Sequence, residues 1–247
     1  MLRPGGAGVR EPGPARLVLV HLSSEGLGRG DASHQAEAIA GIRRYARRVP
    51  LSTAEIQDYY GRFFVLQEGF LRGALRVAPV GKVREPRALT RGERAARKPV
   101  RFKPDEGSRP LDLVGATWAV LTIVSRRVIA VLESERFAGW ATYPVELDGV
   151  GVDADAYHGL AVHGRCGDID NSLTPKKMVP PPVPEGEAVP GRRGLLFEHG
   201  SWDGSDLFCP SEGTAIFVTR DVRDALIAAK VKNLHFERVT DVERIWD

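Results

Sequence analysis

The chain has 247 residues and a formal net charge of +3, and none of its apolar runs approaches the about 18–20 residues of a membrane span. The small net charge conceals a split: residues 1–110 hold 21 Lys and Arg against 11 Asp and Glu, a net of +10, whereas residues 111–247 hold 14 against 21, a net of −7. Two cysteines do not make a disulfide framework, so the composition favours a reduced, cytoplasmic protein over a secreted one.

The N-terminal part of the chain has the composition of an extension. Residues 1–16 are mostly Gly, Pro and Arg and offer little to bury, so we expect them to be poorly ordered. A short strand at 17–22 and a helix from Asp31 to about Arg48 are expected next. We therefore take residues 1–57 as an N-terminal extension, poorly ordered or helical, which could also reflect a start codon assigned too far upstream.

A single α+β domain is expected over residues 58–247. The capping-box pattern of Ser52 and Glu55 predicts a helix through Tyr60, and the run at 62–66 predicts the first strand. The rest of the domain alternates short strands with short amphipathic helices around a mixed sheet. The predicted strands lie at 119–124, 140–147, 157–162, 195–198, 215–218 and 234–239, and the predicted helices follow Ser125 and, over 221–230, Thr219.

Two segments of this domain are expected to be loops. Five prolines interrupt residues 79–110, and nine Lys and Arg lie within 82–103, which predicts a basic loop with one helical turn near 90–97. The basic run could bind nucleic acid, but Phe102 is its only aromatic residue, and base stacking normally needs several. A solvated loop is the better interpretation, so we do not expect nucleic acid as a partner. Residues 174–194 predict a second loop, because they are rich in Pro and Gly.

Two strand–helix–strand units resemble each other at a constant offset of 94 residues. When residues 123–145 are set over 217–239, five positions are identical, and Ser125 falls on Thr219. Both helices then begin with a hydroxyl residue that can cap the first turn. The sequence therefore predicts two units of similar structure.

One short segment could carry chemistry. Residues 157–170 include His158, His163, Cys166 and Asp168, which is the basis for an alternative function as a metal- or thiol-dependent hydrolase. His158 and His163 are five residues apart and would face opposite sides of a strand, and the usual zinc spacings are absent. A catalytic Cys also needs an activated thiolate and an oriented base. No catalytic residue, metal or cofactor is assigned, and the hydrolase stays an alternative.

The acidic loops of the second half are candidate partner-binding sites. An exposed Trp between carboxylates suits the centre of a protein interface, and a net charge of −7 suits a basic partner. The candidate partner-binding residues are Asp153, Asp155, Asp168, Asp170, Trp202, Asp203 and Asp206.

Five segments carry a resemblance to a known family. They are Phe63-Phe64-Val65-Leu66; Val124-Ser125 with Val128; Gly139-Trp140 with Tyr143-Pro144-Val145; Tyr157 with Leu160 and Val162; and Phe217-Val218-Thr219 with Val222, Asp224, Ala225 and Leu226. Over residues 58–240 the chain resembles the bacterial immunity proteins of polymorphic-toxin systems, a group abundant in myxobacteria. The resemblance implies a cytoplasmic, non-enzymatic protein that binds a cognate toxin, expected to be encoded by the adjacent gene, and neutralises it by stoichiometric occlusion.

Overall fold

A computed structural model describes residues 51–69, 71–117, 120–153, 155–181, 183 and 185–245. The strand expected at 17–22 and the helix expected from Asp31 lie outside these residues. One compact unit covers residues 50–247. It opens with α2 (Thr53–Tyr60), which has the expected capping box and crosses the boundary expected after residue 57.

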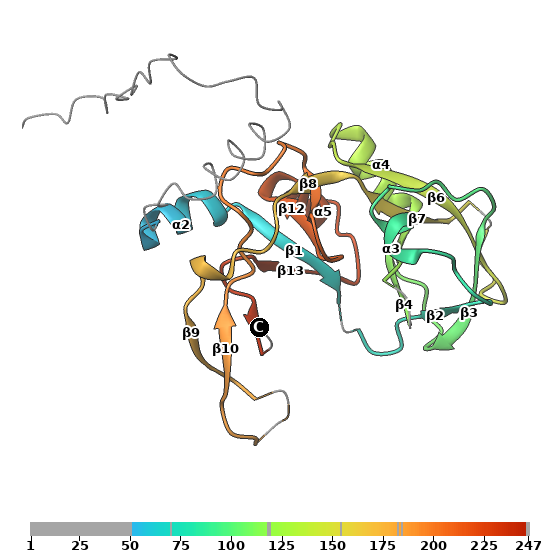
Figure 1. Cartoon of the computed structure of the whole chain (residues 1–247). Coiled ribbons are helices and arrows are strands. Elements are labelled where there is room, and N and C mark those ends of the chain that lie inside the picture. Colours follow the sequence, from blue (N-terminus) through green and yellow to red (C-terminus); the bar gives the residue numbers. More distant parts are fainter. Residues whose placement is uncertain are drawn as a thin grey trace, which may run out of the picture. The chain divides into compact units, whose positions relative to one another are not determined.

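The described strands form a five-stranded sheet, a closed barrel and a small three-stranded sheet (Figure 1). The five-stranded sheet has the order β13 (Leu234–Arg238), β1 (Phe63–Glu68), β12 (Ile216–Thr219), β11 (Leu207–Pro210), β8 (Gly164–Cys166). The barrel has the order β2 (Arg76–Pro79), β3 (Val100–Glu106), β6 (Trp140–Leu147), β7 (Tyr157–Val162), β5 (Thr122–Ser125), β4 (Leu113–Ala116). The expected α+β fold is confirmed. None of the described helices is both long and apolar enough to span a bilayer.

The two similar units are two copies of one structural repeat. The first consists of β4, β5, α4 (Arg126–Ser134) and β6, which begin at residues 113, 122, 126 and 140. The second consists of β11, β12, α5 (Arg220–Ala228) and β13, which begin at 207, 216, 220 and 234, in each case 94 residues later. The predicted similarity is confirmed, and it extends one strand further upstream than the sequence comparison.

Each repeat is completed by an antiparallel strand from a different place in the chain. In the first repeat β7 lies between β5 and β6, and Leu160 faces both Thr122 and Thr142. In the second repeat β1 lies between β12 and β13, and Leu66 faces both Ile216 and Phe236. The equivalent strand thus follows the first repeat directly, whereas the second repeat takes its strand from the beginning of the compact unit.

The hydroxyl residues before α4 and α5 contact equivalent carboxylates. Ser125 Oγ donates to Asp112 Oδ1 at 2.6 Å and accepts from Val128 N at 3.4 Å. Thr219 Oγ1 donates to Asp206 Oδ1 at 3.4 Å but makes no capping hydrogen bond to α5. Thr219 therefore occupies the expected N-cap position without serving as a side-chain cap.

The same two carboxylates join one repeat to the other. Asp112 Oδ2 accepts from the backbone N–H of Lys232, which follows α5, at 2.7 Å. Asp206 Oδ2 accepts from the backbone N–H of Ala138, which follows α4, at 2.8 Å. Lys232 and Ala138 are themselves 94 residues apart, so the contacts are reciprocal and relate the repeats by a local twofold arrangement.

The largest hydrophobic cluster lies where the repeats meet. Helices α4 and α5 contact each other, and each packs on its own repeat's strands. The buried residues of this cluster include three equivalent pairs, Val128 with Val222, Leu132 with Leu226, and Leu160 with Leu66. The repeats therefore share one core rather than forming separate domains.

The segment 79–110 is not the loop that its prolines and charges predict. It contains α3 (Pro86–Thr90), earlier than the helical turn expected near 90–97, and the whole of β3. Only Phe102 is buried on β3, so the strand lacks the apolar alternation that would reveal it. Pro104 lies where the β2–β3 register shifts, a bulge at which a proline costs no ladder hydrogen bond.

The segment 174–194 likewise holds more structure than predicted. It contains β9 (Lys176–Val179) and β10 (Val189–Arg193), which pair with each other, and β10 also pairs with β14 (Glu243–Arg244). Figure 1 shows β9 and β10 side by side, so strands occupy residues 176–179 and 189–193 of the expected loop. The strand expected at 195–198 is reduced to one bridge, between Phe197 and Ile169.

Candidate functional site

Four of the seven candidate partner-binding residues hold turns within the chain. Asp168 accepts from Glu212 N at 3.1 Å, and Asp170 caps the short 3₁₀ helix Asn171–Leu173. Asp203 accepts from Arg165 N at 2.7 Å, and Asp206 holds the two repeats together. Carboxylates in loops satisfy backbone N–H groups in this way, so their acidity alone does not mark an interface.

The remaining carboxylates, Asp153 and Asp155, lie in the loop between β6 and β7. Both are exposed, and neither carboxylate has a hydrogen bond or ion pair with another described residue. A different connection brings residues 165–168 against the turn around Trp202, since Gly167 N donates to Ser201 Oγ at 2.7 Å. The structure therefore links the Asp168 and Trp202 turns through hydrogen bonds but places Asp153 and Asp155 on the barrel.

Trp202 is half-buried rather than exposed as expected, and it belongs to a surface cluster that we call the Trp202 patch. The exposed guanidinium of Arg62 lies 5.0 Å from the Trp202 ring centroid and 5.1 Å from that of Tyr59. Tyr59 in turn packs against the exposed His199, with ring centroids 4.4 Å apart. The Trp202 patch consists of Tyr59, Arg62, His199 and Trp202.

The Trp202 patch rests on the aromatic part of the core. The Trp202 ring packs against Phe63 at 5.1 Å and Phe208 at 5.8 Å, and its Nε1 donates to Ser205 O at 2.9 Å. Rings that are held at their edges and by a hydrogen bond have few other rotamers available. The patch is therefore preorganised, which lowers the entropic cost of binding a partner.

The histidines and the cysteine of the segment 157–170 do not form a reactive group. His163 is exposed, and its Nε2 lies 3.0 Å from Trp140 O. Cys166 is buried on β8, and burial raises the pKa of its thiol, so the nucleophilic thiolate is disfavoured. Across the described part of the chain, no three His, Cys, Asp or Glu side chains converge as metal ligands.

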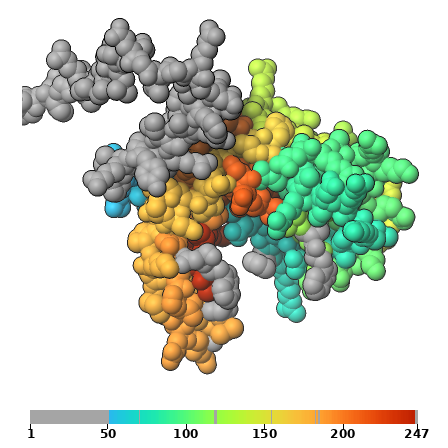
Figure 2. All heavy atoms as spheres, in the orientation of Figure 1, coloured from blue at the N-terminus to red at the C-terminus, as the bar shows by residue number. Residues whose placement is uncertain are grey.

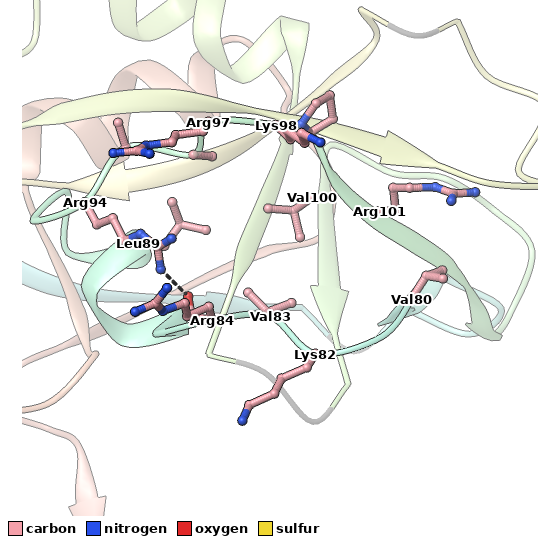
Figure 3. Close-up of a pocket in the computed structure, with 13 residues that line it drawn as sticks. Val80, Lys82, Val83, Arg84, Leu89, Arg94, Arg97, Lys98, Val100 and Arg101 are labelled. Carbon is pink, nitrogen blue, oxygen red and sulfur yellow. Dashed lines mark hydrogen bonds between the residues drawn. The ribbon is translucent and has the colours of Figure 1, made fainter.

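The basic run forms a hollow that sequence reasoning missed. A cavity of about 390 Å³ lies between the 80–84 segment, α3 and the start of β3; we call it the basic pocket. Figure 3 shows Lys82 and Arg84 on one side and Arg97 and Lys98 on the other. Its lining residues are Val80, Lys82, Val83, Arg84, Leu89, Arg94, Ala95, Ala96, Arg97, Lys98, Pro99, Val100 and Arg101.

Three of the six cations that line the basic pocket have neighbouring carboxylates. Arg84 and Arg94 share Glu85 at 3.5 Å each, and Arg101 pairs with Asp148 at 2.7 Å. The other three, Lys82, Arg97 and Lys98, have no ion pair or hydrogen bond with a described residue. The pocket therefore keeps a net positive charge. The sequence signal for the basic pocket is the set of aliphatic residues placed among these cations.

No known family model matches the chain, and no curated protein matches it.

Proposed function

We propose that this protein is an immunity protein of a bacterial polymorphic-toxin system. In the cytoplasm it binds a cognate toxin, encoded by the adjacent gene, and neutralises it by stoichiometric occlusion. The observation that carries the proposal is the Trp202 patch. The sequence resemblance over residues 58–240 supports the same conclusion.

The Trp202 patch has the composition of an interface centre. Tyr, Trp and Arg are the residue types that contribute most to binding energy in protein complexes. Here Arg62 stacks on both Tyr59 and Trp202 while remaining exposed. A partner that covers the patch would gain a large contact area without having to order these side chains.

Acidic residues beside the Trp202 patch would favour a basic toxin. Asp203 and Asp168 are exposed even though each accepts a backbone hydrogen bond, and a carboxylate has further acceptor positions. Charges at the rim of an interface mainly raise the association rate and fix the orientation. We therefore assign these carboxylates to steering and the Trp202 patch to holding the complex.

The hydrolase alternative gains no support from the geometry of its own residues. The Cys166 thiol is buried and its pKa is raised, whereas a nucleophilic cysteine needs access and a lowered pKa. Its neighbour Cys209 is also buried, and burial raises the pKa of that thiol too. Both cysteines are therefore best described as core residues.

Coexpression with the protein of the adjacent gene tests the proposal. We expect the full chain to protect cells from that protein and to copurify with it. Arg62→Glu should abolish both effects, because it reverses the charge at the centre of the Trp202 patch. Arg72→Glu is the matched control: Arg72 is an exposed arginine in a turn outside the patch, so this variant should protect fully. The proposal fails if the full chain neither protects nor copurifies.

A further inference from the structure

We propose that the basic pocket is a binding site for an acidic peptide segment that carries a branched aliphatic side chain. This site is separate from the Trp202 patch, and the inference does not rest on the proposed function. It follows from the charge at the rim of the pocket, from the chemistry of its floor and from the residue types that its lining lacks.

The rim is built to attract anions from several directions. In Figure 3, Arg97 and Lys98 lie opposite Lys82 and Arg84, so cations face each other across the opening. Like charges in such an arrangement repel, and an anionic ligand between them relieves the repulsion. Lys82, Arg97 and Lys98 have no described anionic partner of their own, which leaves them free to contact carboxylates of a ligand.

The floor of the pocket is aliphatic. Val83, Leu89 and Val100 lie between the two groups of cations in Figure 3, and Leu89 is buried while both valines are half-buried. Carboxylates alone would leave this apolar surface in contact with water. A Leu, Ile or Val side chain next to the carboxylates would cover it, and burial of apolar surface favours binding.

The lining argues against a nucleic acid as the occupant. Among the residues that the structure describes, no aromatic side chain lines the pocket, so bases would find no ring of this lining on which to stack. The described lining also contains no Asp, Glu, Asn, Gln, Ser or Thr, so the amino groups of bases would find no side-chain acceptor in it. Cations with an aliphatic floor match a peptide better than they match a base.

The pocket is attached firmly to the rest of the unit. Thr90, at the end of α3, donates from Oγ1 to Val120 O at 2.7 Å. Arg91 Nη1 donates to Pro210 O, on β11 of the second repeat, at 2.7 Å. On the other side, β3 pairs with both β2 and β6 of the barrel. The two elements that flank the pocket, α3 and β3, are therefore held in place before a ligand arrives.

Fluorescence anisotropy with a labelled peptide tests the inference on the purified full chain. The probe is an octapeptide with two central leucines flanked on each side by three Glu or Asp residues. We expect saturable binding that weakens as salt is raised, because the contacts at the rim are ionic. Replacement of both leucines by serine should weaken binding roughly fivefold or more, because the aliphatic floor loses its partner.

Charge-reversal variants locate the site. Arg97→Glu combined with Lys98→Glu should weaken binding of the leucine peptide by about tenfold or more. The matched control combines Arg87→Glu with Lys103→Glu, which changes the net charge equally at exposed positions outside the lining, and should bind as the wild type does. Circular dichroism confirms that both variants fold.

The inference would be overturned by a lack of peptide binding, by equal loss of binding in the two double variants, by equal binding of the serine peptide, or by tighter binding of an oligothymidylate than of the leucine peptide. Inorganic phosphate that displaces the peptide completely at equal concentration would also overturn it, since the aliphatic floor would then contribute nothing. None of these results depends on the toxin, so they leave the test of the proposed function unaffected.

Discussion

Ser52 and Glu55 exchange hydrogen bonds at the start of α2. Ser52 N donates to Glu55 Oε2 at 2.7 Å, and Glu55 N donates to Ser52 Oγ at 3.2 Å. Hydrogen bonds with Ser52 lower the pKa of the Glu55 carboxyl, and the one with the side chain contributes more than the one with the backbone. A lowered pKa in the folded state means that the ionised carboxylate stabilises the fold above its unfolded pKa. This contribution is lost as the pH falls through the folded pKa.

Substitution of the cap should restore the ordinary titration of Glu55. We expect a pH titration followed by NMR to give Glu55 a lower pKa in the wild type than in Ser52→Ala. The same substitution should lower the free energy of unfolding at pH 7 by about 1 kcal/mol. Ser172→Ala, in the 3₁₀ helix Asn171–Leu173, serves as a control that leaves α2 intact. An unchanged Glu55 pKa in Ser52→Ala would contradict this description of the cap.

Single residues also show what the sequence could not reveal about the candidate site. The turns of the second half place Asp beside Gly and Ser, a composition typical of turns in which the carboxylate accepts backbone hydrogen bonds. In the structure Asp168, Asp170, Asp203 and Asp206 all accept hydrogen bonds from nearby donors. Which donor a carboxylate meets depends on segments distant in the chain, such as Ala138 for Asp206. Sequence alone could not reveal these partners.

At the scale of elements, the reciprocal carboxylates Asp112 and Asp206 should be important for stability. Each accepts a backbone N–H from the opposite repeat, and a hydrogen bond to a charged group stabilises a fold more than one between neutral groups does. We expect Asp112→Ala and Asp206→Ala each to lower the free energy of unfolding by about 1.5–3 kcal/mol in urea titrations. Asp153→Ala, at an exposed carboxylate without such contacts, should change it by less than about 0.5 kcal/mol. Equal effects at the three positions would contradict the reciprocal contact.

Whether an element could be predicted depended on its local pattern. The strands at 140–147 and 157–162, and the helix capped by Ser125, were identified because apolar spacing and capping residues are local signals. β3, β9 and β10 were missed because they have few buried side chains and contain or adjoin prolines. Pairing with distant strands holds them in place, and no single stretch of sequence records that pairing.

At the scale of the whole molecule, β1 has an unusual position. It begins the compact unit, yet it is the central strand of the second repeat and pairs with both β12 and β13. The equivalent strand β7 follows its own repeat directly. The second repeat should therefore need β1 in order to fold, but it should still fold when β1 is attached to the C-terminal end of the chain.

A circular permutant tests this dependence. A chain that starts at residue 71 and carries residues 51–70 after residue 247, through a flexible linker of about 12 residues, should unfold cooperatively. The same chain without residues 51–70 should fail to unfold cooperatively, because buried Phe63, Phe64, Val65 and Leu66 would be missing from the core. Cooperative unfolding of the shortened chain with an unchanged midpoint would contradict the assignment of β1 to the second repeat.

The two candidate surfaces come from different parts of the unit. The Trp202 patch lies over the aromatic core around β1 and β11, whereas the basic pocket belongs to the barrel side, on α3 and β3. Figure 2 shows the residues coloured green, which include residues 82–103, on the right of the visible face. Six of the nine Lys and Arg in residues 82–103, which the sequence predicts to lie in a solvated loop, line the basic pocket.

Titration of the toxin's activity with the purified protein tests the central claim most directly. If the protein neutralises by occlusion, residual activity should fall linearly with added protein and reach zero at one equivalent, and Arg62→Glu should leave the activity intact. If a small fraction of one equivalent abolished the toxin's activity, and the loss progressed with time, the result would contradict stoichiometric occlusion and indicate an enzyme.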